Sequence, residues 1–442
     1  MLKEKIKEVV NYIRNIPKNK ILKVISHFDT DGVTSAAIFT KTLQRADIKF
    51  SLEIVKNLET SFIESLPEDS PIVFLDLGSG SLSTLKNKKT KIIILDHHIL
   101  EDNNIPENII MVNPLLYKKE QMASSGLCYL FAKTLSENNK DLANLAVIGM
   151  VGDMMEKNVS KDYDEIIKDA SAIVKRGLLL YPATRPIDRV LENSFGIYIP
   201  GVTGSYKGTI ELLKDAGITK TDRGFKSIAE MTKEEMSRLG TSIMLKNLAS
   251  SNASDILGNI YLIKLFNNVE DAREISAMIN ACSRMERSEV ALALCLGNKE
   301  LKKEAEKIYA KYKKAISSAL ESLQETQKIS GKNYTIINAQ DKIKDTIIGT
   351  IASIISFSPL YPEGTIIVAM AYNQNKIKVS ARLAGRKGRN VREILHKATI
   401  PLSTEIGGHP NAAGCLIPKD KESQFIENLR QTLEVEVIKV NS

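Results

Sequence analysis

Aspartates and histidines gather in four short segments of the chain. The segments are HFDTDG (27–32), Asp76 at the end of IVFLD (72–76), DHH (96–98) and Asp153 in GMVGDMM (149–155). Only five histidines occur in the chain, and three of them lie in these segments. Carboxylates and imidazoles grouped in this way are typical ligands of divalent metal ions.

This grouping predicts a binuclear metal centre. Several carboxylates within a few ångströms repel one another, and some stay protonated near neutral pH unless cations offset their charge. Oxygen ligands with a few imidazoles suit Mn²⁺ or Mg²⁺, and the imidazoles favour Mn²⁺. Two ions about 3.5–4 Å apart generate hydroxide from water and hold a phosphate for in-line displacement. The predicted chemistry is hydrolysis of a phosphate ester with two divalent cations as cofactors.

A simpler interpretation applies to each segment taken alone. An aspartate after a strand is usually a helix cap or a turn residue, and DHH alone could be a polar turn beside a buried strand. Four such segments in one chain favour the metal centre over this alternative. In HFDTDG, the alternating residues His27, Asp29 and Asp31 share one face if the strand continues through them.

The elements that must position these residues alternate between strand and helix. ILKVIS (21–26), IVFLD (72–76) and KIIILD (91–96) are predicted strands, and VTSAAIFTKTLQ (33–44) has helical spacing. Such alternation predicts an α/β fold with a parallel sheet covered by helices on both faces. Ligands of these sheets bind beyond the carboxyl ends of the strands, so the predicted metal centre lies at that edge.

The pattern changes along the chain, which predicts more than one domain. A catalytic domain is expected over residues 1–156, a helical insertion over 157–270 and a return to the catalytic domain over 271–300. A long, mostly polar linking helix is expected over 301–330, followed by a smaller α/β domain over 331–442. In that last domain we expect strands at 334–339, 365–372 and 376–385, with a helix at 347–357.

Composition restricts the class of protein. The chain has 442 residues with 43% hydrophobic and 26% charged residues, which excludes a mainly disordered chain. Its net charge of +8 permits a polyanionic partner without requiring one. The four cysteines include no CxxC pair, no apolar run reaches the roughly 18 residues that span a bilayer, and the N-terminus lacks the features of a signal peptide. We therefore expect a cytoplasmic protein without membrane contact.

Other residues are candidates for binding a polyanion. RLAGRKGRNVR (382–392) has five cations and no acid, and the glycines of GGHPNAAG (407–414) let backbone N–H groups approach a ligand. Asn280 and Arg284 lie four residues apart on one predicted helix face, so both could reach the same phosphate. Ser124 and Ser125 are expected to be helix caps only.

The motifs resemble those of the DHH phosphoesterase superfamily. HFDTDG, Asp76, DHH and Asp153 match its four motifs in order, and GGHPNAAG is similar to the motif of the DHH-associated domain. The segment NACSRM (280–285), the long linking helix and the insertion are similar to archaeal RecJ-like nucleases, including the GINS-associated type.

This resemblance implies roles for particular residues. One ion would be held by His27, Asp29 and Asp76, and the other by Asp31, Asp76, His97 and Asp153, with Asp76 bridging. Asp96 would orient a ligand, and His98 would contact the scissile phosphate or assist the leaving group. The residues implied in substrate binding are Asn280, Arg284, Ser380, Arg382, Gly407, Gly408 and His409.

The function implied by the resemblance is a single-strand-specific exonuclease. It would hydrolyse DNA or RNA to mononucleotides in replication or repair, with GINS as a partner. A nanoRNase or nucleotide phosphatase of the same superfamily would share the metal ligands. A replication-complex scaffold that binds GINS is an alternative of a different class, and a cyclic dinucleotide hydrolase is disfavoured because sensory and membrane segments are absent.

Overall fold

The structure is a computed structural model. It describes residues 2–100, 102–117, 121–157, 159–194, 199–246, 256–323, 325–358, 360–385, 387–402, 404 and 406–440. The chain forms two compact units. Unit 1 is built from described residues of 1–194, 201–242 and 255–309, and most of unit 2 comes from residues 310–442.

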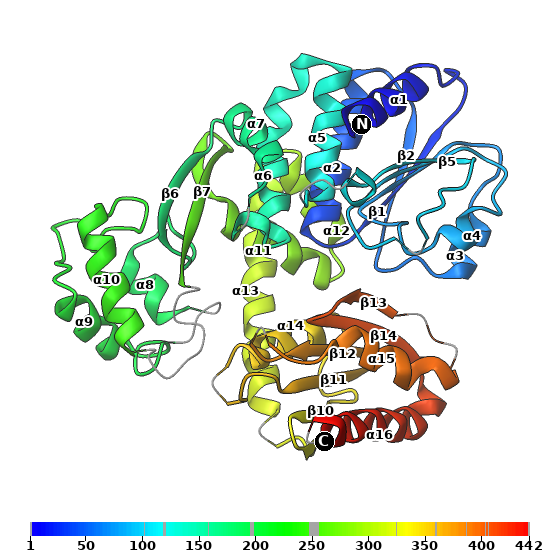
Figure 1. Cartoon of the computed structure of the whole chain (residues 1–442). Helices are drawn as coiled ribbons and strands as arrows, with labels where there is room; N and C mark the ends of the chain where they lie inside the picture. Colours follow the sequence, from blue (N-terminus) through cyan, green and yellow to red (C-terminus); the bar gives the residue numbers. More distant parts are fainter. Residues whose placement is uncertain are drawn as a thin grey trace. The chain divides into compact units, whose positions relative to one another are not determined.

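A five-stranded, fully parallel sheet forms the centre of unit 1 (Figure 1). In spatial order its strands are β2 (Phe50–Val55), β1 (Leu22–His27), β3 (Ile72–Leu75), β4 (Ile92–Leu95) and β5 (Ile109–Val112). The predicted strands at 21–26, 72–76 and 91–96 are therefore confirmed. Strands β2 and β5 were not predicted: β2 is only partly buried along its length, whereas β5 is as short and as buried as β3 and β4 but does not end at an aspartate.

Helices cover both faces of this sheet, as the alternating pattern predicts. One face packs against α1 (Leu2–Arg14), α2 (Thr30–Arg45) and α5 (Ser124–Leu135) in the largest apolar core. The other face packs against the short helices α3 (Thr60–Ser65) and α4 (Leu82–Leu85). The helices α6 (Ala143–Gly152), α7 (Lys161–Asp169), α11 (Ala272–Arg284) and α12 (Ser288–Cys295) extend the first core.

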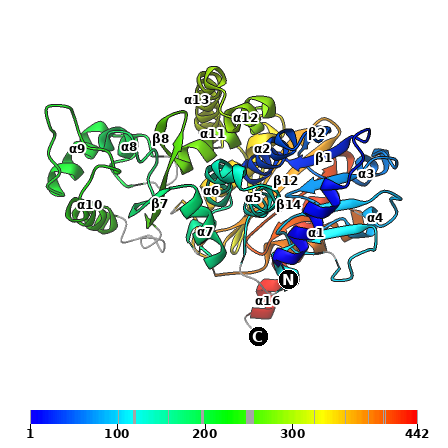
Figure 2. The same cartoon turned by 90° about the horizontal axis from the view of Figure 1, so that it is seen from above.

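The segment expected to be a helical insertion contains a sheet as well as helices. Its helices are α7, α8 (Ile187–Glu192), α9 (Tyr206–Asp215) and α10 (Lys233–Lys246). An antiparallel sheet of β6 (Ile173–Leu178), β7 (Leu257–Leu265) and β8 (Asn268–Asp271) was not predicted. Figure 2 shows α8, α9 and α10 on the far side of β7 from the parallel sheet.

Both ends of this segment belong to the main core of unit 1. Tyr163 and Ile166 of α7 and Tyr261 and Ile263 of β7 are buried among the residues of the catalytic core. The β6–β7 pair closes in register at Leu178 opposite Leu257. The part of the insertion that leaves the core therefore begins after Leu178 and returns at Leu257.

Unit 2 is built on a mixed six-stranded sheet. In spatial order its strands are β13 (Ile406–His409), β14 (Ala412–Pro418), β12 (Lys376–Leu383), β11 (Ile366–Asn373), β10 (Tyr334–Asn338) and β9 (Lys328–Gly331). Helix α14 (Asp345–Ser356) packs on β11 and β12, whereas α15 (Val391–Thr399) packs on β14 and on α16 (Glu422–Val440). The predicted strands at 334–339, 365–372 and 376–385 and the helix at 347–357 are confirmed.

Helix α13 (Lys299–Ser322) continues from unit 1 into unit 2 and is more apolar than expected. Buried residues recur along it at helical spacing, namely Ala305, Ile308, Tyr312, Ile316 and Ala319. The helix ends before 330, because β9 begins at Lys328. Helix α13 therefore carries a narrow stripe of buried, mostly apolar residues, although its sequence is rich in lysine.

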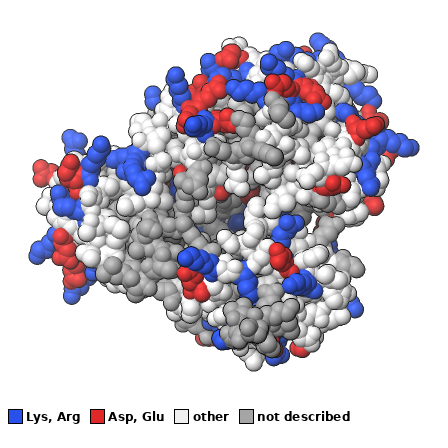
Figure 3. Space-filling view, in the orientation of Figure 1, with Lys and Arg blue, Asp and Glu red and all other residues white. Residues whose placement is uncertain are grey.

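Charged side chains are mixed over the face of the molecule drawn in Figure 3, where Lys and Arg alternate with Asp and Glu on unit 1. The small net excess of cations is thus not gathered into a single surface on this face. All four cysteines are buried and unpaired. None of the described helices combines the length and hydrophobicity that crossing a bilayer requires.

Candidate metal centre

The predicted metal ligands of unit 1 meet at the carboxyl edge of the parallel sheet. His27 ends β1, Asp76 follows β3, and the DHH turn follows β4. Asp153 reaches the same place from the end of α6, where it is the residue after the last helical turn. Segments more than 120 residues apart therefore bring their carboxylates and imidazoles together, as the parallel topology requires.

HFDTDG does not continue as a strand, which corrects the expected alternation of its residues. The strand stops at His27, Asp29 is the N-cap of α2, and Asp31 lies in the first turn of that helix. The Asp29 side chain accepts a hydrogen bond from the Gly32 N–H at 3.0 Å, as N-cap aspartates do. The three side chains still reach one site because the chain turns sharply from strand to helix.

One group of possible ligands consists of His27, Asp29 and Asp76. The Nδ1 atom of His27 lies 3.0 Å from Asp29 Oδ2 and 3.3 Å from Asp76 Oδ2. One ligand atom from each of these three residues lies within 4.8 Å of the others. A single divalent cation fits a set of this composition.

A second group consists of Asp31, His97 and Asp153. The Nε2 atom of His97 lies 3.0 Å from Asp153 Oδ2 and 3.9 Å from Asp31 Oδ2. These three residues also offer ligand atoms within 4.8 Å of one another. A third group, Asp76, His97 and His98, shares Asp76 with the first group and His97 with the second, so the possible ligands of two cations form one continuous cluster.

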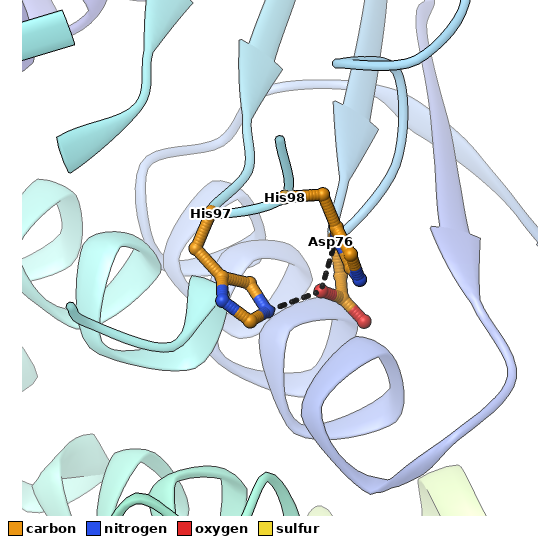
Figure 4. A group of neighbouring side chains, drawn as sticks. All are labelled: Asp76, His97 and His98. Carbon is orange, nitrogen blue, oxygen red and sulfur yellow. Dashed lines mark ion pairs between the residues drawn. The ribbon is translucent and has the colours of Figure 1, made fainter. Parts of the chain in front are cut away.

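Asp76 belongs to the first group and also lies beside the two histidines of the DHH turn (Figure 4). Its Oδ2 faces His27, whereas its Oδ1 lies 3.4 Å from His97 Nε2 and 3.8 Å from His98 Nδ1. The backbone of Asp76 has φ of 60°, a left-handed conformation that is rare for residues other than glycine. Such backbone strain is often found at functional sites, and here it accompanies a carboxylate that can bridge two ions.

Asp96 supports the DHH turn through hydrogen bonds, and only 1% of the residue is exposed. Its Oδ1 accepts hydrogen bonds from the His97 N–H at 2.8 Å and from His98 Nδ1 at 2.7 Å, and its Oδ2 accepts from the Ser79 N–H at 3.0 Å. These contacts fix the orientation of both histidines. The ring of His98 is the more exposed of the two, with 39% of its side chain accessible.

Burial and the neighbouring charged groups shift the pKa values of these aspartates. Burial, followed by repulsion from Asp153 and Asp76, raises the pKa of Asp31 well above its usual range. Burial also raises the pKa of Asp153, although His97 opposes this change. In Asp76 burial is outweighed by contacts with His27 and His97, so its pKa lies well below the usual range. Without cations, the site therefore keeps protons on some of its acids.

The histidines of the site also gain protons. Burial disfavours the charged ring of His27, but Asp29 and Asp76 outweigh it and raise its pKa well above the usual value. His97 behaves in the same way through Asp153 and Asp76. For His98, burial is outweighed by Asp96, and its pKa rises to about 9. Imidazolium groups thus take the place of cations when only the chain is present.

The residues present fit divalent cations. Asp153 Oδ2 is buried, and its contact among the described residues is with His97 Nε2 at 3.0 Å. A buried carboxylate is costly unless a cation or proton offsets its charge. The predicted ligands His27, Asp29, Asp31, Asp76, His97 and Asp153 are all in the cluster, and a divalent ion in each group would satisfy them.

Ser124 and Ser125 do not have the helix-capping role that was expected. Neither side chain caps α5, whose N-cap is Ala123. Their backbone N–H groups instead donate to the two oxygens of Asp31, at 2.7 and 2.9 Å, and the Ser124 hydroxyl donates to Asp76 Oδ1 at 3.1 Å. The adjacent serines at a helix start were visible in the sequence, but their carboxylate partners lie about 50 and 90 residues away.

Asn280 and Arg284 both lie on α11, but Asn280 contacts the start of α2 and Arg284 contacts Phe28. The side-chain oxygen of Asn280 accepts a hydrogen bond from the Thr30 N–H at 3.1 Å, so it secures the start of α2. The Arg284 guanidinium lies 5.8 Å from the ring centre of Phe28, and that ring is edge-on to His27 at 5.0 Å. Arg284 is therefore beside the metal ligands, whereas part of Asn280 is used to build the fold.

The candidate substrate-binding residues of unit 2 form two rows across three strands. Arg382 of β12 and His409 of β13 both lie opposite Ala412 of β14, on its two sides. Ser380 and Gly407 flank Gly414 in the same way. Cross-strand neighbours point to the same face of a sheet, so sequence positions far apart meet on one surface.

The glycine-rich segment is a β-hairpin and not the open loop that was expected. Gly408 has φ of +119°, and a Cβ there would lie 2.4 Å from the Ala412 carbonyl oxygen, so only glycine fits. Gly407 is open, with no atom within 4 Å of an added Cβ. The hairpin therefore leaves Gly407 open, while Gly408 allows β13 to approach β14 closely.

Two arginines of the basic segment 382–392 form hydrogen bonds within unit 2. The Arg382 Nε donates to Ser353 Oγ at 2.9 Å, and Arg389 Nη1 donates to the Leu433 carbonyl at 2.9 Å. Arg386 lies outside the described residues. Of the five cations expected to contact a phosphate chain, Arg389 is thus also a structural link to α16.

Comparison with known proteins agrees with these features. The DHH family N-terminal domain matches residues 21–150, the DHHA1 domain matches residues 331–435, and the DHH-CID domain matches residues 180–259. An uncharacterized protein of Methanocaldococcus jannaschii is 28% identical over 462 residues, covering 97% of this chain and 98% of its own.

Two solved structures share the fold. RecJ from Thermus thermophilus, solved with Mn²⁺, has a TM-score of 0.61 at 19% identity and is matched over 98% of this chain. The chain spans 55% of the length of that RecJ. CDC45 from Entamoeba histolytica has a TM-score of 0.65 at 13% identity, over 97% of this chain and 99% of its own.

Metal binding is expected to strengthen as the pH rises. Asp31, Asp153, His27 and His97 bind protons more tightly when folded, so those protons must leave before two cations enter. The same raised pKa values make the metal-free chain lose stability as the pH rises through them. The measurement is thermal unfolding with and without Mn²⁺, at about pH 6 and about pH 8. For each proton displaced, the affinity for Mn²⁺ should rise about tenfold per pH unit.

Asp76→Asn is the control for this experiment, because it removes the shared carboxylate and should remove the Mn²⁺-dependent shift at both pH values. A Mn²⁺-dependent rise in melting temperature that is equal at both pH values, or larger at the lower one, would contradict the expected proton displacement.

Proposed function

The chain is a DHH-superfamily protein with the fold shared by RecJ and CDC45, and we propose that it is a metal-dependent exonuclease acting on single-stranded DNA or RNA. The observation that carries this proposal is the Asp76 carboxylate, whose Oδ2 faces His27 and whose Oδ1 faces His97. Hydrolysis to mononucleotides would serve replication or repair.

Two divalent ions at this site supply a hydroxide at neutral pH and positive charge beside the reacting phosphate. His27, Asp29 and Asp76 would hold one ion, and Asp31, Asp76, His97 and Asp153 would hold the other. Asp96 keeps the two histidines of the DHH turn in place through its hydrogen bonds. This division gives each ion at least one imidazole, which favours Mn²⁺ over Mg²⁺.

His98 would donate a proton to the leaving group or contact the scissile phosphate. Its ring is the exposed one of the pair, and Asp96 holds its Nδ1. Because Asp96 raises the pKa of His98 to about 9, the ring carries a proton at neutral pH. A protonated imidazole can stabilise a developing negative charge or donate to the leaving oxygen.

Unit 2 would bind the nucleotide chain through the two rows on β12, β14 and β13. Arg382 and His409 would offer donors in one row, and the buried Ser380 and the open backbone of Gly407 would offer them in the other. Arg284, beside Phe28 in unit 1, would add a contact near the reacting phosphate. Donors spread over several phosphates suit a polymer better than a small phosphate ester.

The ions in two solved RecJ structures support the choice of cofactor. RecJ from Thermus thermophilus has been solved in complex with Mn²⁺ and also in complex with Mg²⁺. We propose the same pair of candidate ions here, with Mn²⁺ preferred because of the imidazole ligands. A nanoRNase or nucleotide phosphatase would use the same ligands and differ in the length of its substrate.

A replication-complex scaffold is the second candidate function. The specific observation in its favour is the similarity to CDC45 over almost the full length of both chains, together with the match to the DHH-CID domain. GINS is the partner that we propose for this role. Binding to GINS does not exclude hydrolysis, so the two functions require separate tests.

Removing the shared carboxylate should abolish hydrolysis. Asp76→Asn or His97→Ala is expected to lower the cleavage rate more than about 100-fold, because even groups that only support metal ligands change activity by 10–100-fold. The assay uses end-labelled single strands of DNA and RNA, labelled at either end, with Mn²⁺. Full activity of the wild-type chain in excess chelator would refute the binuclear mechanism.

Removing a substrate-binding side chain of unit 2 should weaken binding of the single strand without changing the rate of the cleavage step. Arg382→Ala or His409→Ala is expected to weaken single-strand binding but to leave cleavage of a minimal phosphodiester nearly unchanged. Affinity should fall with salt by about −0.7 in log–log slope per phosphate contact. Lys332→Ala, on the exposed β9–β10 turn, is the matched control and should bind like wild type. A flat salt response would indicate a small-molecule phosphatase.

Excising the outer part of the insertion should separate the two functions. Leu178 and Leu257 are register partners, so residues 179–256 can be replaced by a Gly/Ser turn of about four residues that closes the β6–β7 hairpin. This segment is narrower than the expected insertion at 157–270, because Tyr163 and Tyr261 belong to the main core. Dinucleotide hydrolysis should persist while association with GINS, measured by a pull-down, is lost. Wild-type affinity for GINS after the excision would instead assign the insertion a role in shaping the substrate path.

A further inference from the structure

We propose that Ser124 is a positioning residue that fixes how the Asp76 carboxylate is divided between the two groups of ligands. The inference rests on the proposed binuclear centre and adds to it a residue that is not itself a metal ligand. Its experimental consequence is a change in the binding of the ion pair, which can be measured without substrate.

The contacts of Ser124 are specific. Its hydroxyl donates to Asp76 Oδ1 at 3.1 Å, and its backbone N–H donates to Asp31 Oδ2 at 2.7 Å. Ser124 therefore donates hydrogen bonds to two carboxylates of the cluster, the shared Asp76 and Asp31 of the second group. Its side chain is completely buried, so water does not compete for the hydroxyl.

A helix-capping role does not account for this hydroxyl. Ser124 is the first residue of α5, after the N-cap Ala123, whose own side chain forms no capping hydrogen bond. The first N–H groups of α5 are satisfied by Asp31. The hydroxyl thus points away from the helix end and toward the carboxylate that follows β3.

The Asp76 carboxylate needs such a restraint. Rotation about the terminal bond of an aspartate is broad and nearly two-fold, so its oxygens are not placed by rotamer preference. Asp76 must keep Oδ2 toward His27 and Oδ1 toward His97 if it is to bridge two ions. A hydrogen bond to Oδ1 alone breaks the equivalence of the oxygens and holds the carboxylate in this orientation.

Ser125 provides a matched control on the same helix. It is also completely buried, and its backbone N–H donates to the other oxygen of Asp31 at 2.9 Å. Its hydroxyl, however, donates to the Ala146 carbonyl at 3.4 Å and also interacts with Asp31, and among the described residues it makes no hydrogen bond with Asp76. Ser124→Ala and Ser125→Ala therefore remove the same atom from neighbouring buried sites and differ in what that atom contacts.

The test titrates the full-length wild-type chain and both variants with Mn²⁺ alone, by calorimetry and by electron paramagnetic resonance. Wild type and Ser125→Ala should bind two ions and give the signal of a coupled Mn²⁺ pair. Ser124→Ala should bind at least one ion about 10–100-fold more weakly, the usual effect of losing a group that supports a metal ligand, and should lose most of the coupled signal. Ser124→Cys, a weak donor of similar size, should fall between Ser124→Ala and wild type.

Melting of the metal-free chains checks that each variant folds. Binding of both ions by Ser124→Ala with wild-type affinity and coupling would overturn the role of Ser124 and leave the binuclear centre intact. Equal loss in Ser125→Ala would also overturn it, because the cause would then be the packing of α5. Failure of the wild-type chain to bind two ions would overturn the proposed centre and this inference together.

Discussion

Repulsion between buried carboxylates is the constraint on which the rest of unit 1 depends. Asp31 and Asp76 are at most 1% exposed, and Asp153 has a buried oxygen whose contact is with His97. Such groups are unfavourable to bury unless they are hydrogen-bonded and their charge is offset. The parallel sheet creates this problem by delivering several strand ends to one edge, and the same edge is where an ion pair would resolve it.

The parts of the chain that hold this site in place carry little chemistry of their own. Helix α5 directs its free N–H groups at Asp31, and Gly149 of α6 leaves the room this needs, because a Cβ there would lie 2.6 Å from Asp31 Oδ1. Helix α11 secures the start of α2 through Asn280 and through the Ser276 carbonyl, which accepts from the Thr30 hydroxyl. A metal site is therefore built by three helices around the ends of three strands.

The sequence was a good guide wherever a local pattern carried the information. The apolar runs that end in Asp76 and Asp96 predicted both the strands and the edge at which the site lies. The short strand β5 and the half-buried strand β2 lacked such a pattern and were missed. The sheet of β6, β7 and β8 was also missed, because β6 and β7 pair across about 80 residues and only the fold brings them together. The same reason applies to Ser124 and to Asn280, whose partners lie far away along the chain.

The energetics of the site bear on the choice between an enzyme and a scaffold. A chain that served only as a scaffold would be more stable with apolar residues in place of Asp31 and Asp153, because their raised pKa values record an unfavourable burial of charge. The left-handed backbone of Asp76 adds strain that docking of a partner elsewhere on the chain does not require. Both unfavourable terms are offset once two cations enter the cluster. The buried carboxylates and the left-handed backbone of Asp76 occur together at the candidate metal site, which supports the proposed hydrolysis over a role as a scaffold alone.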